Sequence, residues 1–237
     1  MSVISAPSAF SANEIQLEDF LDLERFPIHD LTSKKRAALV ADCRKDLEKW
    51  GCAHVPDFIT PSAIQKMKEE AFRIMVGARR AHAWVNPYLT KEDTSLPEDH
   101  PKRFFEERTS SFINSDLLEA DSILRMIYDS DVMVHFVSDC LNVGPLYRWA
   151  EPLGRNPYSV MKGGDYFPWH FDGNDFTLSL LIQKAEKGGI FEYYPDIRDH
   201  QNENYKQVAK VLNGERKDIH LLDLKPGDLQ IFKGRFS

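Results

Sequence analysis

The sequence predicts an α+β fold in which a mainly helical N-terminal half supports a β-rich C-terminal half. Up to about residue 144, apolar residues recur at helical spacing, whereas after residue 145 they form short runs between turn signals. Several short strands at such spacing are typical of an antiparallel sandwich or barrel. We therefore divide the chain into an N-terminal arm (1–30), a helical supporting region (31–144) and a β-rich core (145–237), which together form one structural unit.

The supporting region opens with two helices that carry clear start and stop signals. Residues 32–50 and 60–75 each place apolar side chains on one helical face. Gly51 ends the first helix, and Thr60 followed by Pro61 begins the second. The run CAHVPDF between them reads as a short strand.

The rest of the supporting region combines a long loop with two further helices. Residues 86–112 are polar and show no periodicity, which predicts a loop. Helical patterns near 116–128 and 131–142 close the region. A long loop next to a site can serve as a lid, so we regard 86–112 as a candidate lid.

The C-terminal core consists of short β-prone runs. Turn signals such as GGD, GG and KPGD separate them, and a charged insert with a short helix interrupts two of them. The predicted strands are LYRWAE, PYSVMKG, FTLSLLIQ, GIFEYY, IHLLDL and LQIF.

Composition excludes several classes of partner. Thirty basic and thirty-seven acidic residues give a net charge of -7, which disfavours nucleic acid and anionic membranes as main partners. No apolar run approaches the roughly 18 residues that span a bilayer, and the N-terminus lacks the pattern of a signal peptide. Cys43, Cys52 and Cys140 are scattered, which predicts buried free thiols in a cytoplasmic protein.

The pair His170 and Asp172 is the first candidate site. On a strand, side chains two apart point to the same face, so this imidazole and this carboxylate can converge while Phe171 faces away. One histidine and one carboxylate are two thirds of the facial triad that holds non-haem Fe(II). Taken alone, an H-x-D pattern is weak evidence, because a structural polar pair is the commoner explanation.

The surrounding motifs strengthen the metal interpretation. The stretch KGGDYFPWHFDGNDFTLSLLIQKAEKGGIFEY resembles the core of the Fe(II)/2-oxoglutarate-dependent dioxygenases, in which a Gly-Asp turn, an H-x-D, an apolar strand and a Gly-Gly turn follow in this order. LDLKPGDLQIFKGRFS resembles the hairpin before the distal histidine, and KWGCAHVPDFITPSAIQKMKEEA is similar to the entry of many members. The finer pattern resembles the subset that acts on free amino acids and related small metabolites, which includes hydroxylases and halogenases.

The resemblance implies a double-stranded β-helix (a cupin-like jelly roll) with N-terminal supporting helices. It implies Fe(II) held by His170 and Asp172, 2-oxoglutarate as cosubstrate, dioxygen, and an amino-acid-like small molecule as substrate. The related halogenases carry a small residue in place of the carboxylate, so that chloride can bind the metal. Asp172 fills that position here, and we therefore expect a hydroxylase rather than a halogenase. Desaturation, cyclisation and epoxidation remain open, as do the substrate and the oligomeric state.

The third ligand is missing from the pattern. The resemblance places a distal histidine just beyond Ser237 and a 2-oxoglutarate-binding arginine or lysine further on, so we expect the core to be truncated at its C-terminal end. His220 is an outside candidate for the third ligand, and His200 a weaker one, because both precede the Pro-Gly-Asp hairpin.

Several other residues are candidates for binding the cosubstrate or the substrate, although each could instead serve only in aromatic packing, a turn or a surface contact. Tyr166 and Gln183 are tentative cosubstrate-binding residues, and Trp169 and Asn174 are tentative substrate-binding residues. Three charged residues are candidates for pairing with the charges of an amino acid, with surface ion pairs as the commoner explanation. They are Arg103, Arg108 and Glu151.

Two alternatives remain beside the oxygenase. The chain is either a catalytically inactive or binding relative with a jelly-roll fold, or a cupin-like metal enzyme that does not use 2-oxoglutarate. Succinate formation separates the oxygenase from both.

Overall fold

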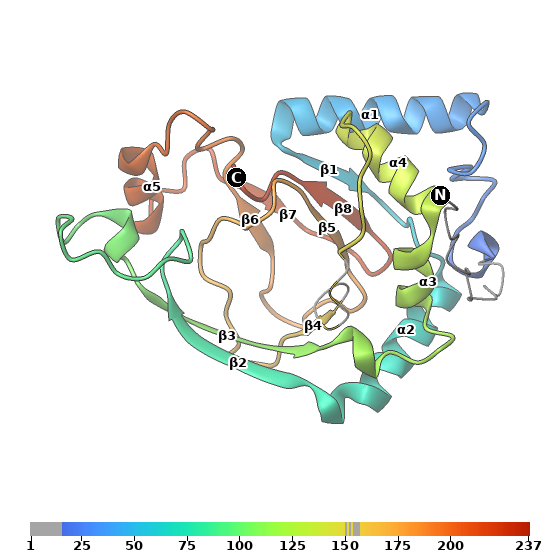
Figure 1. Ribbon diagram of the computed structural model, residues 1–237, viewed down its shortest axis with the longest axis horizontal. Helices are drawn as coiled ribbons and strands as arrows, with labels where there is room; N and C mark the ends of the chain where they lie inside the picture. Colours follow the sequence, from blue (N-terminus) through green and yellow to red (C-terminus); the bar gives the residue numbers. More distant parts are fainter. Residues whose placement is uncertain (1–15, 150, 152, 154–156) are drawn as a thin grey trace, which may run out of the picture.

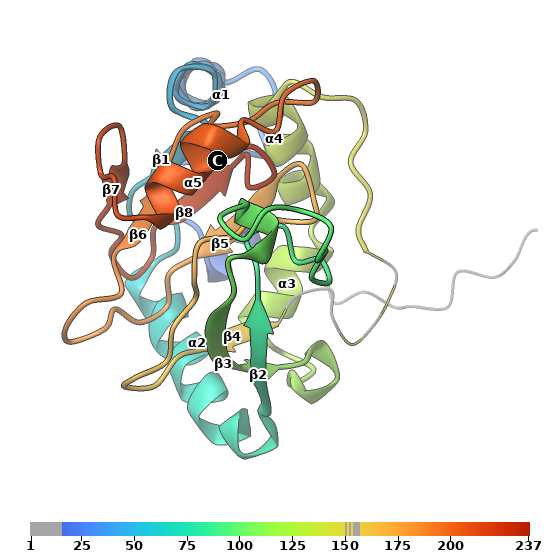
Figure 2. The same ribbon diagram turned by 90° about the vertical axis from the view of Figure 1, so that its left-hand side faces the viewer.

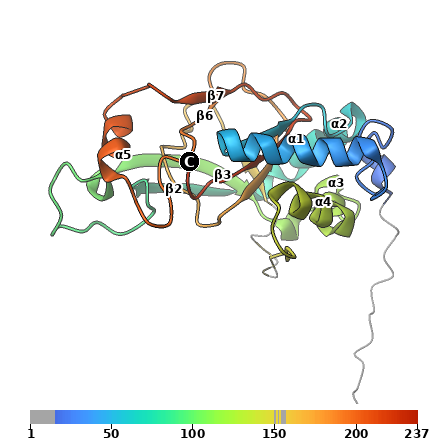
Figure 3. The ribbon, with the colours of Figure 1, turned by 90° about the horizontal axis from the view of Figure 1, so that it is seen from above.

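The computed structural model describes residues 16–149, 151, 153 and 157–237. Within them, five α-helices and three small antiparallel sheets form a mixed α/β architecture that is compatible with a β-sandwich. Seen from above, helices α1 to α4 gather at one end and α5 lies at the other, with most of the strands between them (Figures 1 and 3).

The helices lie where helical periodicity predicts them, apart from their bounds. Ser33 caps the first by accepting a hydrogen bond from the backbone of Arg36, and Gly51 ends it in the left-handed conformation at φ 65°. Thr60 caps the second, with Pro61 as its first residue. The helices are α1 (Lys34–Trp50), α2 (Pro61–Ile74), α3 (Ile123–Asp129), α4 (Asp131–Leu141) and α5 (Tyr205–Leu212).

The strands form sheets of three, three and two strands, and every pairing is antiparallel. The first sheet has the order β1 (Cys52–Val55), β8 (Leu229–Phe232), β5 (Thr177–Leu180). The second has the order β2 (Arg79–Val85), β3 (Glu106–Ile113), β4 (Tyr158–Val160). The third pairs β6 (Phe191–Tyr193) with β7 (His220–Leu222).

The secondary structure differs from the prediction in three places. Residues 106–112 belong to β3 rather than to a loop, and the supporting region also contains β2. β3 was missed because polar residues occupy most of it, and some of their side chains face the candidate site described below. β2 was missed because its apolar residues show no strict alternation with polar ones. The run LYRWAE forms no strand over its described residues.

The main core lies between the helices and the first sheet. It includes Phe58, Met67 and Phe136, all with no exposed side-chain area, and the fully buried Leu229 of β8. Four residues of the predicted N-terminal arm are also part of it, so the described portion of that arm is not a surface segment. They are Phe20, Leu21, Phe26 and Ile28.

All three cysteines are free and buried, as predicted. Among the described residues, none of the helices combines the length and the apolar character that crossing a membrane requires.

The side chain of Asn86 holds the start of the candidate lid (86–112) by hydrogen bonds. The side chain of Asn86, which is fully buried, donates to the backbone oxygens of Thr90 and Lys102 at 3.1 Å and 2.7 Å. Its own oxygen accepts from the backbone of Tyr88 and Thr90. One amide side chain therefore closes the base of the loop between β2 and β3.

The Pro-Gly-Asp turn before β8 is fastened by one buried carboxylate. Asp228 accepts hydrogen bonds from the backbone of Asp57 at 2.9 Å and of Lys225 at 2.8 Å, and lies 2.7 Å from His54 Nε2. Burial alone would raise the pKa of Asp228, but these partners hold it below its usual value.

We expect Asp228→Asn to destabilise the protein by about 2 kcal/mol at neutral pH, because the amide replaces a charged acceptor. Since the folded-state pKa is lowered, the carboxylate contributes stability above its unfolded pKa of about 3.9, and this is lost as pH falls through the folded value. Urea unfolding over a pH series that runs from neutral to below the unfolded-state pKa of about 3.9 should show the difference between wild type and variant shrinking with acid. A difference independent of pH would contradict this role.

Candidate metal centre

His170 and Asp172 lie in an irregular extended segment between β4 and β5, not on a strand as predicted. Two backbone hydrogen bonds hold the segment, from Phe171 to the oxygen of Pro87 and from Asp172 to that of Gly234, both at 2.8 Å. Phe171 is buried against Tyr88, with ring centroids 5.2 Å apart. The predicted alternation is therefore retained, since His170 and Asp172 converge while Phe171 packs elsewhere.

The ring of His170 is oriented by its own backbone. Its Nδ1 lies 2.8 Å from the carbonyl oxygen of Pro168, which can only accept, so Nδ1 carries the proton and donates it. Nε2 then presents a lone pair, 3.4 Å from Asp172 Oδ1. A neighbouring hydrogen bond that fixes the tautomer in this way is usual for histidines that bind metals.

The second oxygen of Asp172 is already engaged. Thr177, the first residue of β5, donates its hydroxyl proton to Asp172 Oδ2 at 2.5 Å. Burial raises the pKa of Asp172, but its close contact with the His170 ring, the hydrogen bond from Thr177 and the nearby positive charge of Arg108 bring it below its usual value. Oδ1 is thus left as the oxygen that a metal would meet.

Gly234 allows the segment after β8 to approach the carboxylate. A Cβ atom at this position would lie 2.1 Å from Asp172 Oδ2 and 2.9 Å from its Cβ. Such distances are far inside van der Waals contact, so any side chain at position 234 would displace Asp172. The observed position of Asp172 therefore requires a glycine at residue 234.

The pair fits two neighbouring positions of a metal ion. With bonds of about 2.1 Å to nitrogen and oxygen, two ligands at a right angle lie about 3 Å apart. The observed 3.4 Å between Nε2 and Oδ1 is close to that separation. The donor set, one neutral imidazole and one carboxylate, suits Fe(II).

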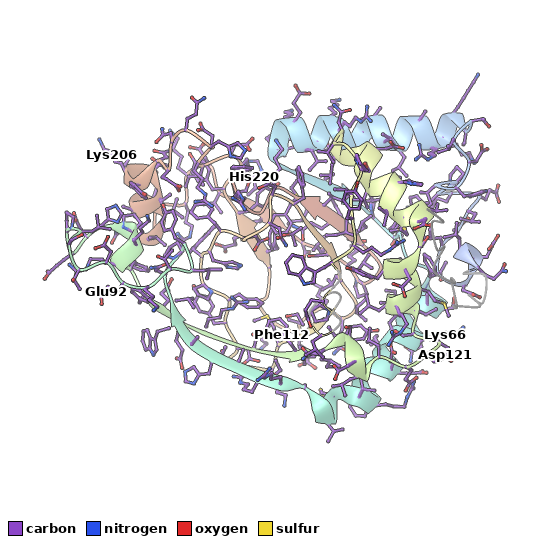
Figure 4. All side chains as sticks on the ribbon, viewed as in Figure 1. Lys66, Glu92, Phe112, Asp121, Lys206 and His220 are labelled. Carbon is purple, nitrogen blue, oxygen red and sulfur yellow. The ribbon has the colours of Figure 1, made fainter. Side chains whose placement is uncertain are left out.

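No third ligand joins the pair among the described residues, where no group of three histidine, cysteine or acidic side chains could hold a metal. His220, the outside candidate, is labelled in Figure 4. Its ring lies against Trp50 at the end of α1, with centroids 5.0 Å apart and the planes tilted. His200 packs against Phe236. Neither completes the site, and a third ligand beyond Ser237 remains a prediction.

One wall beside the pair comes from β3. The guanidinium of Arg108 lies over the ring of Phe167, 4.2 Å from its centroid, and that ring lies 5.9 Å from the ring of His170. Phe112, labelled in Figure 4, is on the same strand face and also neighbours Phe167, at 6.4 Å. The Phe167 ring therefore lies beside the imidazole, and Arg108 and Phe112 of β3 pack around that ring.

Arg108 does not form a surface ion pair with any described residue, although that is the commoner role of an arginine. Its Nε is buried and lacks a hydrogen-bond partner, and no ion pair involves it within the described residues. Burial lowers the pKa of Arg108, which the negative charge of Asp172 partly offsets. A buried donor without a partner costs free energy, so this guanidinium is suited to an anion that binds there.

The tentative site residues have mixed placements. Tyr166 is 47% exposed and forms a bridge with Thr109 of β3, and Trp169 lies beside Arg216. Asn174 is exposed in the turn after Asp172. Gln183 is exposed and lines an outer groove along α2, so it does not face the pair.

The other charged candidates act elsewhere. Arg103 pairs with Glu92 within the loop after β2, at 3.2 Å. Glu151 accepts from the backbone of Leu153. Pro168, Thr177 and Gly234, which orient the two ligands, were not predicted, because their roles depend on contacts that spacing does not reveal.

Replacing Thr177 by valine removes the hydroxyl that holds Asp172 Oδ2 and keeps the side-chain shape. We expect Fe(II) affinity to fall about 10- to 100-fold, as is typical when a partner of a ligand is lost. Isothermal titration under anaerobic conditions measures it. Ser179→Ala, on the same strand, is the matched control, and an unchanged affinity in Thr177→Val would contradict the role of Thr177.

These features define a mixed α/β protein with an oriented histidine–aspartate pair. The sequence model of the family named Halogenase D matches residues 35–236, so the chain belongs to that family. Membership indicates an enzyme of the oxygenase type and is consistent with the 2-oxoglutarate oxygenase superfamily. No curated protein matches the chain significantly.

Proposed function

We propose that the protein is a non-haem Fe(II)- and 2-oxoglutarate-dependent oxygenase that hydroxylates a free amino acid or a similar small polar metabolite. The observation that carries the proposal is the His170–Asp172 pair, with Nε2 and Oδ1 3.4 Å apart and the other polar atom of each side chain engaged. The family match supports the oxygenase class. The proposed fold is a jelly roll, of which the antiparallel sheets are a part.

His170 and Asp172 would hold the iron, which supplies the activation of dioxygen when bound. The protein's own contribution is to fix these two ligands through Pro168 and Thr177. The third position requires a ligand beyond those described, and we propose the distal histidine that the resemblance implies. Phe167, with Phe112 packed behind it, lies beside the imidazole and would limit access of water from that side.

Asp172 supports hydroxylation over halogenation. A halide can bind next to the histidine only where no protein carboxylate occupies the position, and here Oδ1 of Asp172 occupies it. We propose that the product gains oxygen and no halogen, even with chloride or bromide in excess.

Arg108 and Glu106 support a substrate that carries both charges. They are two apart on β3, so their side chains share the face that carries Phe112. Arg108 lacks a partner at Nε, and burial raises the pKa of Glu106. A carboxylate that binds Arg108 and an ammonium that binds Glu106 would satisfy both groups.

The proposal is tested by incubating the purified protein with Fe(II), ascorbate, 2-oxoglutarate and a panel of amino acids. Succinate formation that depends on one amino acid, with an oxygen-containing product by mass spectrometry, is the expected result. Iron binding without succinate under any condition would favour the inactive or binding relative. Substrate oxidation without 2-oxoglutarate would favour the cupin-like enzyme.

Arg108→Gln is expected to raise the KM for the anionic molecule that binds there by about 10- to 100-fold, since a charge-assisted hydrogen bond contributes about 1.5–3 kcal/mol. Initial rates with 2-oxoglutarate and the amino acid varied separately show which of the two it is. Arg25→Gln, at an exposed ion pair with Asp57, is the matched control. Unchanged KM values for both molecules would show that Arg108 binds neither.

A further inference from the structure

Strand β2 is an open edge. It is the first strand in the order β2, β3, β4, and no described strand pairs with its other side. Its seven residues are mostly exposed, and β2 runs along the lower boundary of the molecule in Figure 1 and at the margin of the sheet in Figure 2. Unpaired edges of this length present a row of free backbone donors and acceptors, and proteins usually cover or block them.

The two charged residues of β2, Arg79 and Arg80, lie at one end of the strand and leave its centre unblocked. Proline is absent, and the central residues Ala81, His82 and Ala83 are small or aromatic. His82 is already paired with Glu107 of β3, at 2.6 Å. Three exposed apolar side chains lie on or near this sheet, namely Trp84 (67% exposed), Phe72 (77%) and Val76 (97%).

A groove accompanies the edge. It has a volume of about 510 Å³ and lies on the face of the sheet that carries Arg80. Phe72 and Val76 line it, and Lys162 lies at its basic side. Arg80 is fixed there by Asp165, with 2.6 Å between the charged groups. Trp84 is four residues from Arg80, so both side chains point to the same face of the sheet.

We propose that β2 pairs antiparallel with β2 of a second copy of this chain, giving a two-fold dimer with a continuous six-stranded sheet. Full overlap of the two strands places the two-fold axis at His82. In this register Trp84 lies opposite the partner's Arg80, and Ala81 opposite the partner's Ala83. No two arginines face each other, so the edge is complementary to itself.

The register also joins the exposed tryptophan to the groove. Because Trp84 lies opposite the partner's Arg80, its indole reaches the groove that Arg80 lines, beside Val76. The Arg80 guanidinium, already held by Asp165, presents its flat face to the ring, as in a cation–π contact. The two-fold axis repeats this contact, so each copy contributes one tryptophan and one groove.

The partner is a second copy rather than a foreign strand because the complementarity involves residues of this chain on both sides. A seven-residue strand pair alone is smaller than a standard interface, which buries about 800 Å² on each partner. The groove and the two indoles enlarge the contact and place one large aromatic side chain on each side of the two-fold axis, and tryptophan is enriched among the residues that contribute most to binding.

Sedimentation velocity over a dilution series of the purified protein tests the dimer. We expect a reversible dimer in the wild type and a dissociation constant raised about tenfold or more in Trp84→Ala. Trp149→Ala removes a tryptophan of similar exposure (64%) away from β2 and should leave the dimer intact. Circular dichroism verifies that the variants are folded. A protein that stays monomeric at its highest soluble concentration would overturn the proposal.

Cysteine cross-linking tests the register independently. Directly opposed residues have Cα atoms about 4.5–5.5 Å apart, within the range of a disulfide. We therefore expect His82→Cys to form an intermolecular disulfide on mild oxidation, and Ala81→Cys, which faces the partner's Ala83, to form much less. The three native cysteines are buried and give no background. Preferential cross-linking of Ala81→Cys, or a dimer unaffected by Trp84→Ala, would refute this interface.

Discussion

Replacing Asp172 by glycine is expected to abolish formation of the oxygenated product, with turnover lowered about a thousandfold or more. The change removes Oδ1, the oxygen directed to the metal beside His170 Nε2. It also leaves the Thr177 hydroxyl without its acceptor. Metal affinity should fall together with turnover, because one of the two described ligands is lost.

The same variant distinguishes a ligand from a residue that only supports the fold. A small residue at this position leaves room for an anion beside His170, so we expect chloride to restore part of the iron affinity of Asp172→Gly and to leave the wild type unchanged. Asp223→Ala removes an exposed carboxylate that pairs with Lys184 and is the control for loss of a negative charge. Full turnover in Asp172→Gly would disprove the ligand assignment.

Local signals predicted much of the fold. The caps Ser33 and Thr60 and the turn at Gly51 lie within a few residues of the helix ends they define, so periodicity and capping located α1 and α2. Strand β3 could not be found in this way. Its inner face carries Arg108 and Ser110 instead of an apolar row, and the requirement of a polar site overrides strand propensity there.

In the candidate site, too, some residues could be predicted from the sequence and others could not. His170 and Asp172 were predictable because both ligands lie in one short motif, framed by recognisable turns. The groups that orient them were harder to predict. Pro168 acts through its carbonyl, which any residue has, and Gly234 acts by lacking a side chain far along the chain. The environment of Arg108 likewise depends on Phe167 and on the packing of two separate segments.

Gly234→Ala should therefore damage the site although it alters no ligand. The new methyl group would lie 2.1 Å from Asp172 Oδ2, so the carboxylate, the segment after β8, or both must move. Moving the carboxylate breaks the Thr177 hydrogen bond, and moving the segment weakens the bond from Asp172 N to Gly234 O. We expect Fe(II) affinity to fall at least about tenfold and the free energy of unfolding by about 1–3 kcal/mol.

Gly163→Ala provides the matched comparison, because no atom lies within 4 Å of the Cβ it would add. Neither glycine has a positive φ, so backbone strain is equal and small in the two variants, and the difference between them reports the contact with Asp172. Equal metal affinities in the two variants, measured by anaerobic titration, would mean that the segment after β8 does not position Asp172. Loss of affinity in Gly234→Ala alone, with the fold retained, would show that a backbone approach from β8 sets the geometry of the carboxylate.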